Sequence, residues 1–253
     1  MKHSLLTLVI LMFAVGIAHA DDNRQYFGLH LGYANTTYRL NQINTVNKYE
    51  LVSTPMNGFK FGVVYDATLV AGFGYSLGLN YTFASAMSKW EDYPYTEAGK
   101  WIDLRHYPTT LEYRTRSEYH QMEVFVDWQY KFQIAKDTWV MLYTGPTVQC
   151  VVKDVETSFV RRKNDGSDVK QQIMDYYKYS DELDNYFHRL NVTWGVGAGF
   201  QYKRYFLRGG YDFGLINPYA FDNFHVLDSS IDRNTRGRLD QWQIKLGIYL
   251  WEK

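Results

Sequence analysis

Hydrophobic and polar residues alternate with a period of two in eight segments of the chain after Gln25. This period is typical of β-strands, because successive side chains of a strand point to opposite faces. One long segment sets an apolar face against a small polar face: Phe73, Tyr75, Leu77, Leu79, Tyr81 and Phe83 against Gly72, Gly74, Ser76, Gly78, Asn80 and Thr82. No long stretch shows the helical period, so the pattern predicts an all-β protein.

The eight segments are separated by connections that are alternately short and long. The segments begin near Phe27, Phe59, Phe73, Met122, Val140, Leu190, Tyr205 and Trp242, and the fifth is the weakest because Thr144 and Pro146 interrupt it. Short connections are predicted at Asp66–Thr68, at Ala135–Asp137 and near Arg204; long ones are predicted at Leu40–Pro55, Ala84–Arg116, Asp154–Phe187 and Ile216–Arg236. This alternation predicts an up-and-down series of hairpins, with both termini at the end where the short turns lie.

Two kinds of barrel fit the alternation. A soluble lipocalin-like barrel places its apolar face inside, whereas a membrane barrel places it outside. The glycines favour the membrane barrel, because they crowd the polar face and the interior of an eight-stranded barrel needs small residues. We therefore expect an eight-stranded antiparallel up-and-down transmembrane β-barrel with four long extracellular loops and short periplasmic turns. Because backbone groups in lipid must all be paired, we expect the ring to be closed.

The first twenty residues have the organisation of a signal peptide. Lys2 supplies a positive charge, Leu5–Ile17 form an apolar run, and Ala18-His19-Ala20 match a small-x-small cleavage site. The apolar run is shorter than the about 20 residues that a transmembrane helix needs. We expect residues 1–20 to be cleaved and residues 21–253 to form a single barrel domain.

Charge and composition exclude several classes of protein. Lys and Arg together number 27, as do Asp and Glu, so the formal net charge is +0 and offers no electrostatic footprint for nucleic acid. The mean hydropathy of −0.39 argues against a helical membrane protein. A single Cys excludes an internal disulfide framework and a thiolate-rich metal site.

Three stretches resemble a known family. Ser117–Val152, Trp194–Phe200 and Leu207–Asn217 are similar to strands of the outer-membrane β-barrel domain family of Bacteroidetes, sometimes called PorT-like. The resemblance implies an outer-membrane location and eight strands, and it transfers no catalytic residues. The chain departs from bacterial barrels at its end, Leu250-Trp251-Glu252-Lys253, where an aromatic residue is usual. Only part of the signal read by the outer-membrane insertion machinery is therefore matched.

Charged residues fall on the face that is predicted to point inward. They are Lys60, Glu123, Asp127, Lys131, Arg189, Lys203, Arg208, Asp212 and Lys245. Such a set can act as a selectivity filter or proton relay, or it can plug the lumen with ion pairs and hydrogen bonds. We favour the plug, because small barrels fill their interior with side chains and buried charges require partners.

Neither catalysis nor a cofactor is predicted. His106, His120, His188 and His225 fall in or near the long connections, but no nucleophile, base and orienting residue can be grouped from the pattern. Asp165-Gly166-Ser167-Asp168 lacks the alternating ligands of a calcium loop and predicts a turn. We expect no cofactor and no metal.

The long connections are the most promising recognition elements. Aromatic residues gather there: Trp90, Tyr93, Tyr95, Trp101, Tyr176, Tyr177 and Tyr179. These side chains suit binding of an extracellular protein or glycan, although they can equally pack the connections together. We expect a monomer in contact with outer-membrane lipid and its lipopolysaccharide leaflet, with a structural or surface-recognition role. A narrow channel for small solutes and an outer-membrane lipid-modifying enzyme are the alternatives.

Overall fold

The computed structural model describes residues 24–41, 55–93, 110–175, 188–218 and 236–253. The predicted signal peptide, residues 1–20, lies outside these ranges. Ten strands are present in the described ranges: β1 (Arg24–Asn41), β2 (Met56–Val70), β3 (Phe73–Met87), β4 (Glu91–Asp92), β5 (Leu111–Ala135), β6 (Thr138–Arg162), β7 (Asp168–Asp175), β8 (Leu190–Tyr202), β9 (Tyr205–Gly214) and β10 (Arg236–Glu252). Among the same residues, no helix has both the length and the apolar character needed to cross a membrane.

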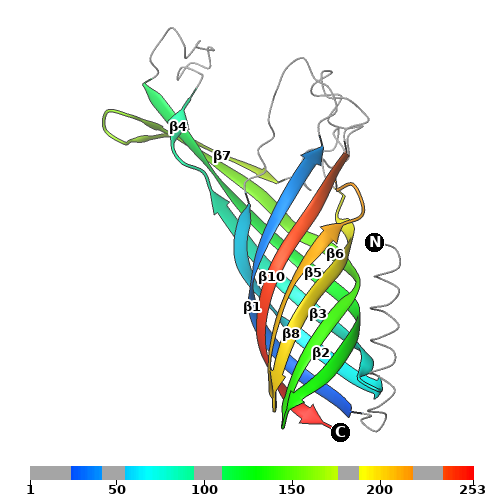
Figure 1. The fold of residues 1–253 in the computed structure, drawn as a ribbon. Helices are drawn as coiled ribbons and strands as arrows, with labels where there is room; N and C mark the ends of the chain where they lie inside the picture. The colour runs from blue at the N-terminus through cyan, green and yellow to red at the C-terminus, as the bar shows by residue number, and fades with distance from the viewer. Residues whose placement is uncertain (1–23, 42–54, 94–109, 176–187, 219–235) are drawn as a thin grey trace, which may run out of the picture.

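Eight of these strands form a closed antiparallel ring in the order β1, β2, β3, β5, β6, β8, β9, β10 (Figure 1). The ring closes where β1 pairs with β10, for example at Tyr33 opposite Ile244. Each strand otherwise pairs with the next barrel strand along the chain. The predicted eight-stranded up-and-down barrel is confirmed.

Short turns join the hairpins at one end of the barrel, here called the turn end, and the opposite end is the loop end. The turns occupy 71–72, 136–137 and 203–204. Ala71, Gly72, Asp137 and Lys203 all have positive φ values, which tight hairpin turns require. The predicted turn at Asp66–Thr68 is wrong, because β2 continues to Val70 and the side chain of Asp66 is buried inside the barrel.

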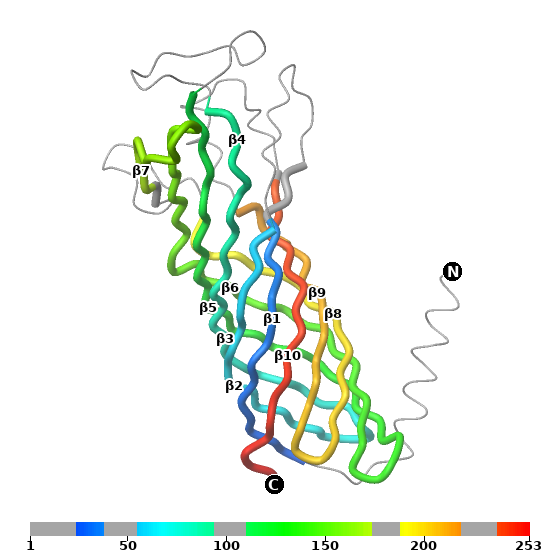
Figure 2. Tube along the Cα trace, turned by 90° about the vertical axis from the view of Figure 1, so that its left-hand side faces the viewer, coloured from blue at the N-terminus to red at the C-terminus, as the bar shows by residue number. Residues whose placement is uncertain are grey.

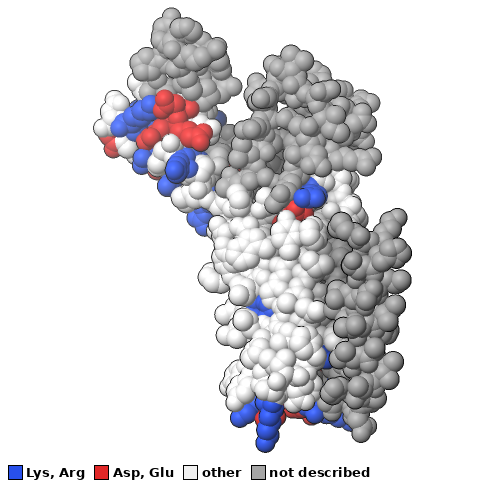
Figure 3. Space-filling view, viewed as in Figure 1, with Lys and Arg blue, Asp and Glu red and all other residues white. Residues whose placement is uncertain are grey.

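The aromatic and aliphatic faces of the strands point outward. Leu31, Phe59, Trp128 and Leu246 are each more than half exposed, and every barrel strand carries similar residues. Figure 3 shows this surface as a white band between charged residues at the turn end and charged residues beyond the loop end. An exposed apolar belt around a closed ring is the surface that contacts lipid.

The interior of the barrel, the lumen, is filled by pairing glycines with large side chains on the neighbouring strand. Gly78 lies opposite Phe125, and Gly247 lies opposite Phe206. A Cβ atom at either glycine would overlap the facing ring. This explains why glycines crowd the inward face in the sequence, as small barrels leave little room inside.

Strand β6 is longer and more regular than the sequence suggests. It runs without a break from Thr138 to Arg162, including Thr144 and Pro146. The ladder between β5 and β6 skips Gly145 and Pro146, while β6 stays paired with β8 there. Since Pro146 lacks an N–H, it is accommodated by one local gap in a single ladder.

Strands β5 and β6 continue past the barrel and form a second structure there. Together with β4 and β7 they make a four-stranded sheet in the order β4, β5, β6, β7, called here the distal sheet (Figures 1 and 2). The predicted loops Ala84–Arg116 and Asp154–Phe187 therefore contain strands. Outside lipid both faces of a sheet can carry polar side chains, so the apolar alternation that marks the barrel strands is lost.

If the apolar belt faces lipid, the stability cost of a charged substitution should depend on its depth in the bilayer. Leu246 lies at the middle of the outward face of β10 and is 63% exposed. We expect Leu246→Arg to reduce the free energy of unfolding by about 2–4 kcal/mol, because it places a charge near the centre of the bilayer. Thr138→Arg, at the turn end, should cost no more than about 1 kcal/mol. Guanidinium chloride unfolding in phospholipid vesicles measures both, and equal costs would contradict the lipid-facing assignment.

Candidate functional site

Seven of the charged residues expected to point inward are buried in the lumen. Each is at most 5% exposed: Lys60, Glu123, Asp127, Lys131, Arg208, Asp212 and Lys245. They come from β2, β5, β9 and β10, so the cluster depends on closure of the ring.

Two residues expected to point inward do not. Arg189 is exposed just before β8, and its guanidinium lies 3.4 Å from the carbonyl oxygen of Val151 near the loop end. Lys203 is exposed in the turn between β8 and β9. Both lie where the strand alternation has already stopped, so counting alternate positions no longer indicates the face.

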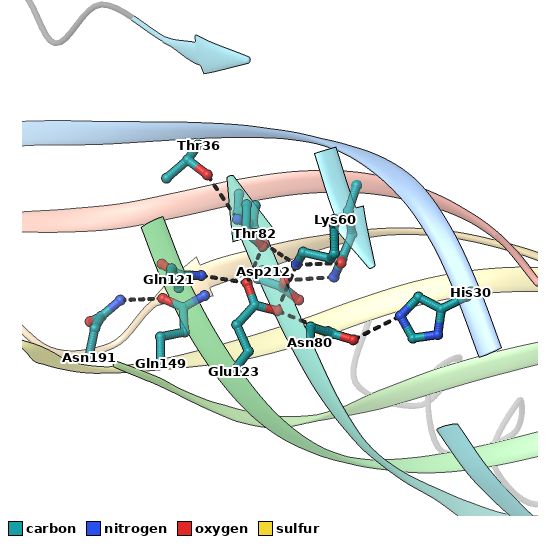
Figure 4. Close-up of polar contacts among 12 residues, drawn as sticks. His30, Thr36, Lys60, Asn80, Thr82, Gln121, Glu123, Gln149, Asn191 and Asp212 are labelled. Atoms are coloured by element: carbon teal, nitrogen blue, oxygen red, sulfur yellow. Dashed lines mark hydrogen bonds and ion pairs between the residues drawn. The ribbon is translucent and has the colours of Figure 1, made fainter. Parts of the chain in front are cut away.

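The first buried network centres on Lys60 and Glu123 (Figure 4). Lys60 Nζ donates to Glu123 Oε2 at 2.7 Å and to Gln243 Oε1 at 2.7 Å, and it also donates to Gln241. The Glu123 carboxylate also accepts from Asn80 Nδ2 at 2.9 Å and from Gln121. Because both charged groups have several partners, their burial is compensated.

This network connects side chains from most of the barrel strands. His30 Nε2 and Asn80 Oδ1 are 2.8 Å apart, which adds β1 to the network (Figure 4). Gln243 Nε2 donates to Asp212 Oδ2 at 2.7 Å, which adds β9. Side chains from β1, β2, β3, β5, β9 and β10 are therefore connected across the lumen. Such a network specifies one arrangement of the strands.

A second network centres on Asp66, which sequence analysis assigned to a turn. Arg208 Nη2 donates to both carboxylate oxygens of Asp66, at 2.7 and 2.8 Å. Lys131 Nζ lies 3.5 Å from the same carboxylate, which also accepts from Tyr249 and Ser76. The signal was present in the sequence, since Asp66 continues the inward series of Gly58, Lys60 and Gly62 by even numbers.

The central lumen is balanced in charge. Four acids lie there, Asp66, Glu123, Asp127 and Asp212, and four bases, Lys60, Lys131, Arg208 and Lys245. The excess of bases in the sequence-based set disappears once Arg189 and Lys203 are removed and Asp66 is added. Balance is required, because an unpaired buried charge costs several kcal/mol.

Both ends of the lumen also contain apolar clusters. Near the turn end the cluster comprises Tyr26, Val64, Phe125, Met141, Phe206 and Tyr249. Near the loop end it comprises Met56, Ala84, Tyr119, Val151 and Leu239. Along β2, Val64 of the first cluster lies between Lys60 and Asp66, so packed apolar side chains separate the two charged networks.

The distal sheet carries a second candidate site on the face that continues the outer wall of the barrel. Trp90 lies between two guanidinium groups: the Cζ atom of Arg161 is 3.8 Å from a ring centroid of Trp90, and that of Arg114 is 4.5 Å away. On the other side, Arg114 lies 5.6 Å from the ring centroid of Phe159. Contacts of this kind between cations and aromatic rings are favourable and fix the orientation of the side chains.

Ion pairs surround this stack. Arg161 Nε donates to Glu112 Oε1 at 2.7 Å, and Lys163 Nζ lies 2.5 Å from Asp92 Oδ1. Glu118 receives two cations, Lys153 at 2.8 Å and Arg116 at 2.9 Å. The hydrogen bond from Lys153 lowers the pKa of the Glu118 carboxyl, so this group stays ionised at neutral pH.

The aromatic recognition residues predicted from the sequence are only partly described. Trp90 takes part in the stack, and Tyr93 packs against Tyr113 with ring centroids 5.8 Å apart. Tyr95, Trp101, Tyr176, Tyr177 and Tyr179 lie outside the described residues. Trp90 and Tyr93 therefore stabilise the distal sheet. Arg114 and Arg161 complete the stack around Trp90, although they are far from it in the sequence.

Two of the described histidines have polar partners, one inside the barrel and one on its outer surface. His30 contacts Asn80, and His120 Nδ1 lies 2.6 Å from the hydroxyl oxygen of Tyr81 on the outer surface. Neither contact includes a serine or a carboxylate. In the described ranges no group of three His, Cys, Asp or Glu side chains is placed to hold a metal ion.

The Asp66 network generates a stability prediction. Arg208→Met leaves the Asp66 carboxylate with a weaker set of partners in a buried site, so we expect a loss of about 3 kcal/mol in the free energy of unfolding. Asp66→Leu combined with Arg208→Met should lose less than the two single changes added together. The matched control Arg204→Met, in an exposed turn, should change stability by less than about 0.5 kcal/mol. Denaturant unfolding in vesicles checks the series; additive losses would show that the two residues are not coupled.

Comparisons with known proteins found a matching family model and similar solved structures. A model of the outer membrane protein beta-barrel domain matches residues 19–219, which is most of the chain. Among solved structures, Ail, the attachment invasion locus protein of Yersinia pestis, is 10% identical with a TM-score of 0.37, over 90% of this chain and 99% of that one. Neisserial surface protein A (NspA) is 10% identical with a TM-score of 0.36, over 90% and 99% of the two chains. The outer membrane enzyme PagL is 10% identical with a TM-score of 0.38, over 86% and 98%.

A search of curated protein sequences found no match. In barrels of this architecture the short turns face the periplasm and the longer connections face the outside. The turn end is then periplasmic, and the distal sheet extends from the extracellular surface. From the extent of the family match and the closed eight-stranded ring, the chain belongs to the outer membrane protein beta-barrel domain family.

Proposed function

We propose that this integral outer-membrane protein is a non-conducting, non-enzymatic surface protein that presents the distal sheet to an extracellular protein or glycan. The observation that carries the proposal is the continuity of β5 and β6, each of which runs for 25 residues from the turn end into the distal sheet. A binding surface built on such strands is positioned more precisely than one built on a flexible loop.

The lumen supports the same proposal. Its charged residues have partners among themselves, and apolar side chains pack between the two networks and at the loop end. In the narrow channel that is the alternative, water and ions would have to pass the Asp66–Arg208 contact. A plug of paired side chains needs no such path.

Several further properties belong to the same proposal. We infer that residues 1–20 are removed as a signal peptide, that residues 21–253 act as one domain, and that the protein is a monomer inserted by the outer-membrane machinery. The cleavage motif before Asp21 supports the first point. Membership of the PorT-like group of Bacteroidetes is also proposed, on the likeness of Ser117–Val152 and the glycine-rich strands.

Conductance separates the plug from a filter. Wild-type protein in planar bilayers should show no steady ion current. The double change Glu123→Gln and Asp127→Asn should lower the stability of the barrel, because it removes the carboxylate that accepts from Lys60 and one of the two acids that interact with Lys245. It should still show no steady current. Single-channel recording and denaturant unfolding give the two quantities. A steady wild-type current whose ion selectivity shifts in the double variant would contradict the plug.

A shortened protein tests the role of the distal sheet. Residues 88–115 can be replaced by Asn-Gly between the paired residues Met87 and Arg116, and residues 156–187 by a short Gly-Ser linker. The barrel should still fold, which a shift in gel mobility on boiling detects. Nanodiscs that carry the full protein should bind members of an array of glycans and matrix proteins, and nanodiscs with the shortened protein should not.

The matched control keeps the distal sheet and changes the other end of the barrel. Lys136→Gln with Arg204→Gln, in the turns, should bind the array like the wild type. If the shortened barrel folds and retains all binding, the distal sheet is not the recognition element.

A further inference from the structure

The outer face of the distal sheet begins where the lipid-facing belt ends. On β5 the even-numbered residues point outward, and this series changes from the apolar Met122 to the polar and charged residues His120, Glu118, Arg116 and Arg114. On β6 the last exposed apolar residue of the belt is Val152, and Lys153 follows it directly. A bulge between His120 and Gln121 lets both strands keep these side chains on the same face.

The cations nearest the belt lie beside exposed apolar residues. Lys153 follows Val152 directly, and Arg116 is paired with Met87 of β3, which is 52% exposed. Apolar surface therefore reaches the level of Arg116, and the layer of lipid headgroups begins there. Arg114 is two residues beyond Arg116 on β5, so it lies further from the belt than Lys153 and Arg116 do.

Arg114 is a cation without a carboxylate partner among the described residues. Its guanidinium lies against Trp90 and Phe159, and its buried Nε atom has no hydrogen-bond partner in the described part of the chain. The two rings hold the guanidinium in place, while the acids nearby, Glu112 and Asp92, are paired with Arg161 and Lys163. Arg114 therefore contributes a positive charge that the sheet itself does not neutralise.

The group next to it also carries an excess positive charge. Arg116 and Lys153 share the single carboxylate of Glu118, so the three residues together have a net charge of +1. Arg114 and Arg116 are two positions apart on one strand and point to the same side. Together the four residues present +2 to the outside, and the half-exposed side chains of Arg116 and Lys153 are long enough to reach an anion.

We propose that this face binds the phosphorylated saccharide headgroup of a glycolipid in the outer leaflet of the protein's own membrane, the lipid A region of lipopolysaccharide. A phosphate monoester carries about −1.5 to −2 charges near neutral pH, which complements the +2 of the site. Arginine suits phosphate because its planar guanidinium donates two parallel hydrogen bonds. Figure 3 shows the charged residues of the distal sheet beyond the apolar belt.

This inference goes beyond the proposed function. The ligand there is outside the cell and contacts the distal sheet as a whole, whereas the glycolipid lies in the same membrane and contacts only the outer face. Binding of the glycolipid would also hold the distal sheet at a fixed angle to the membrane surface.

The experiment titrates purified full-length protein in detergent with diphosphoryl lipid A and counts bound lipid by native mass spectrometry. Arg114→Gln with Arg116→Gln should weaken binding at least ten-fold. The control Lys170→Gln with Lys136→Gln removes the same charge from the opposite face of the distal sheet and from a turn, and should bind like the wild type. A mobility shift on boiling shows that every variant is folded.

Two further probes identify the chemistry. Dephosphorylated lipid A should bind at least ten-fold more weakly, and wild-type binding of the diphosphoryl form should weaken as salt is raised. Equal binding of phosphatidylglycerol would overturn the glycolipid assignment, and unchanged binding by the Arg114 and Arg116 variant would overturn the site. Because no extracellular ligand is present, a failure here leaves the array result on the distal sheet unaffected.

Discussion

Enclosing charge in a narrow barrel is the constraint on which the rest of this structure depends. Asp66 and Arg208 lie 142 residues apart in the chain and meet across the lumen through two charge-assisted hydrogen bonds. Neither can be buried alone, because the desolvation of a single ion costs more than the fold can supply. The pair therefore requires that the first and last thirds of the chain come together, and the glycine-rich inward faces provide the space in which it fits.

The other lumen contacts follow from the same constraint. Four acids are matched by four bases, and amides of Gln121, Gln241 and Gln243 satisfy oxygens that the cations do not reach. Asp127 and Lys245 interact electrostatically, and the Lys245 ammonium group also lies 4.8 Å from the Phe125 ring. A lumen organised in this way has a single favourable arrangement, which suits a barrel whose outer surface only needs to be apolar.

The barrel could be predicted from the sequence because lipid enforces the alternation. An outward residue such as Leu246 must be apolar, and an inward one such as Gly247 must be small or polar, so period and face are visible without a structure. The position of Asp66 was predicted wrongly because the polar sequence Asp66-Ala67-Thr68 resembles a turn. Its even residue number nevertheless places it on the same inward face of β2 as Lys60. The distal sheet was missed for a different reason: in water neither face of Leu111–Thr115 is obliged to be apolar, so this part of β5 leaves no periodic signal.

Strands β5 and β6 form one unbroken structural unit between the two sides of the membrane. A pull on the distal sheet is transmitted through their paired backbones to the turn at 136–137, and the ladders to β3 and β8 spread it around the ring. Unlike a tethered loop, this hairpin cannot swing freely. A force applied to the distal sheet is therefore distributed over the hydrogen bonds of several barrel strands.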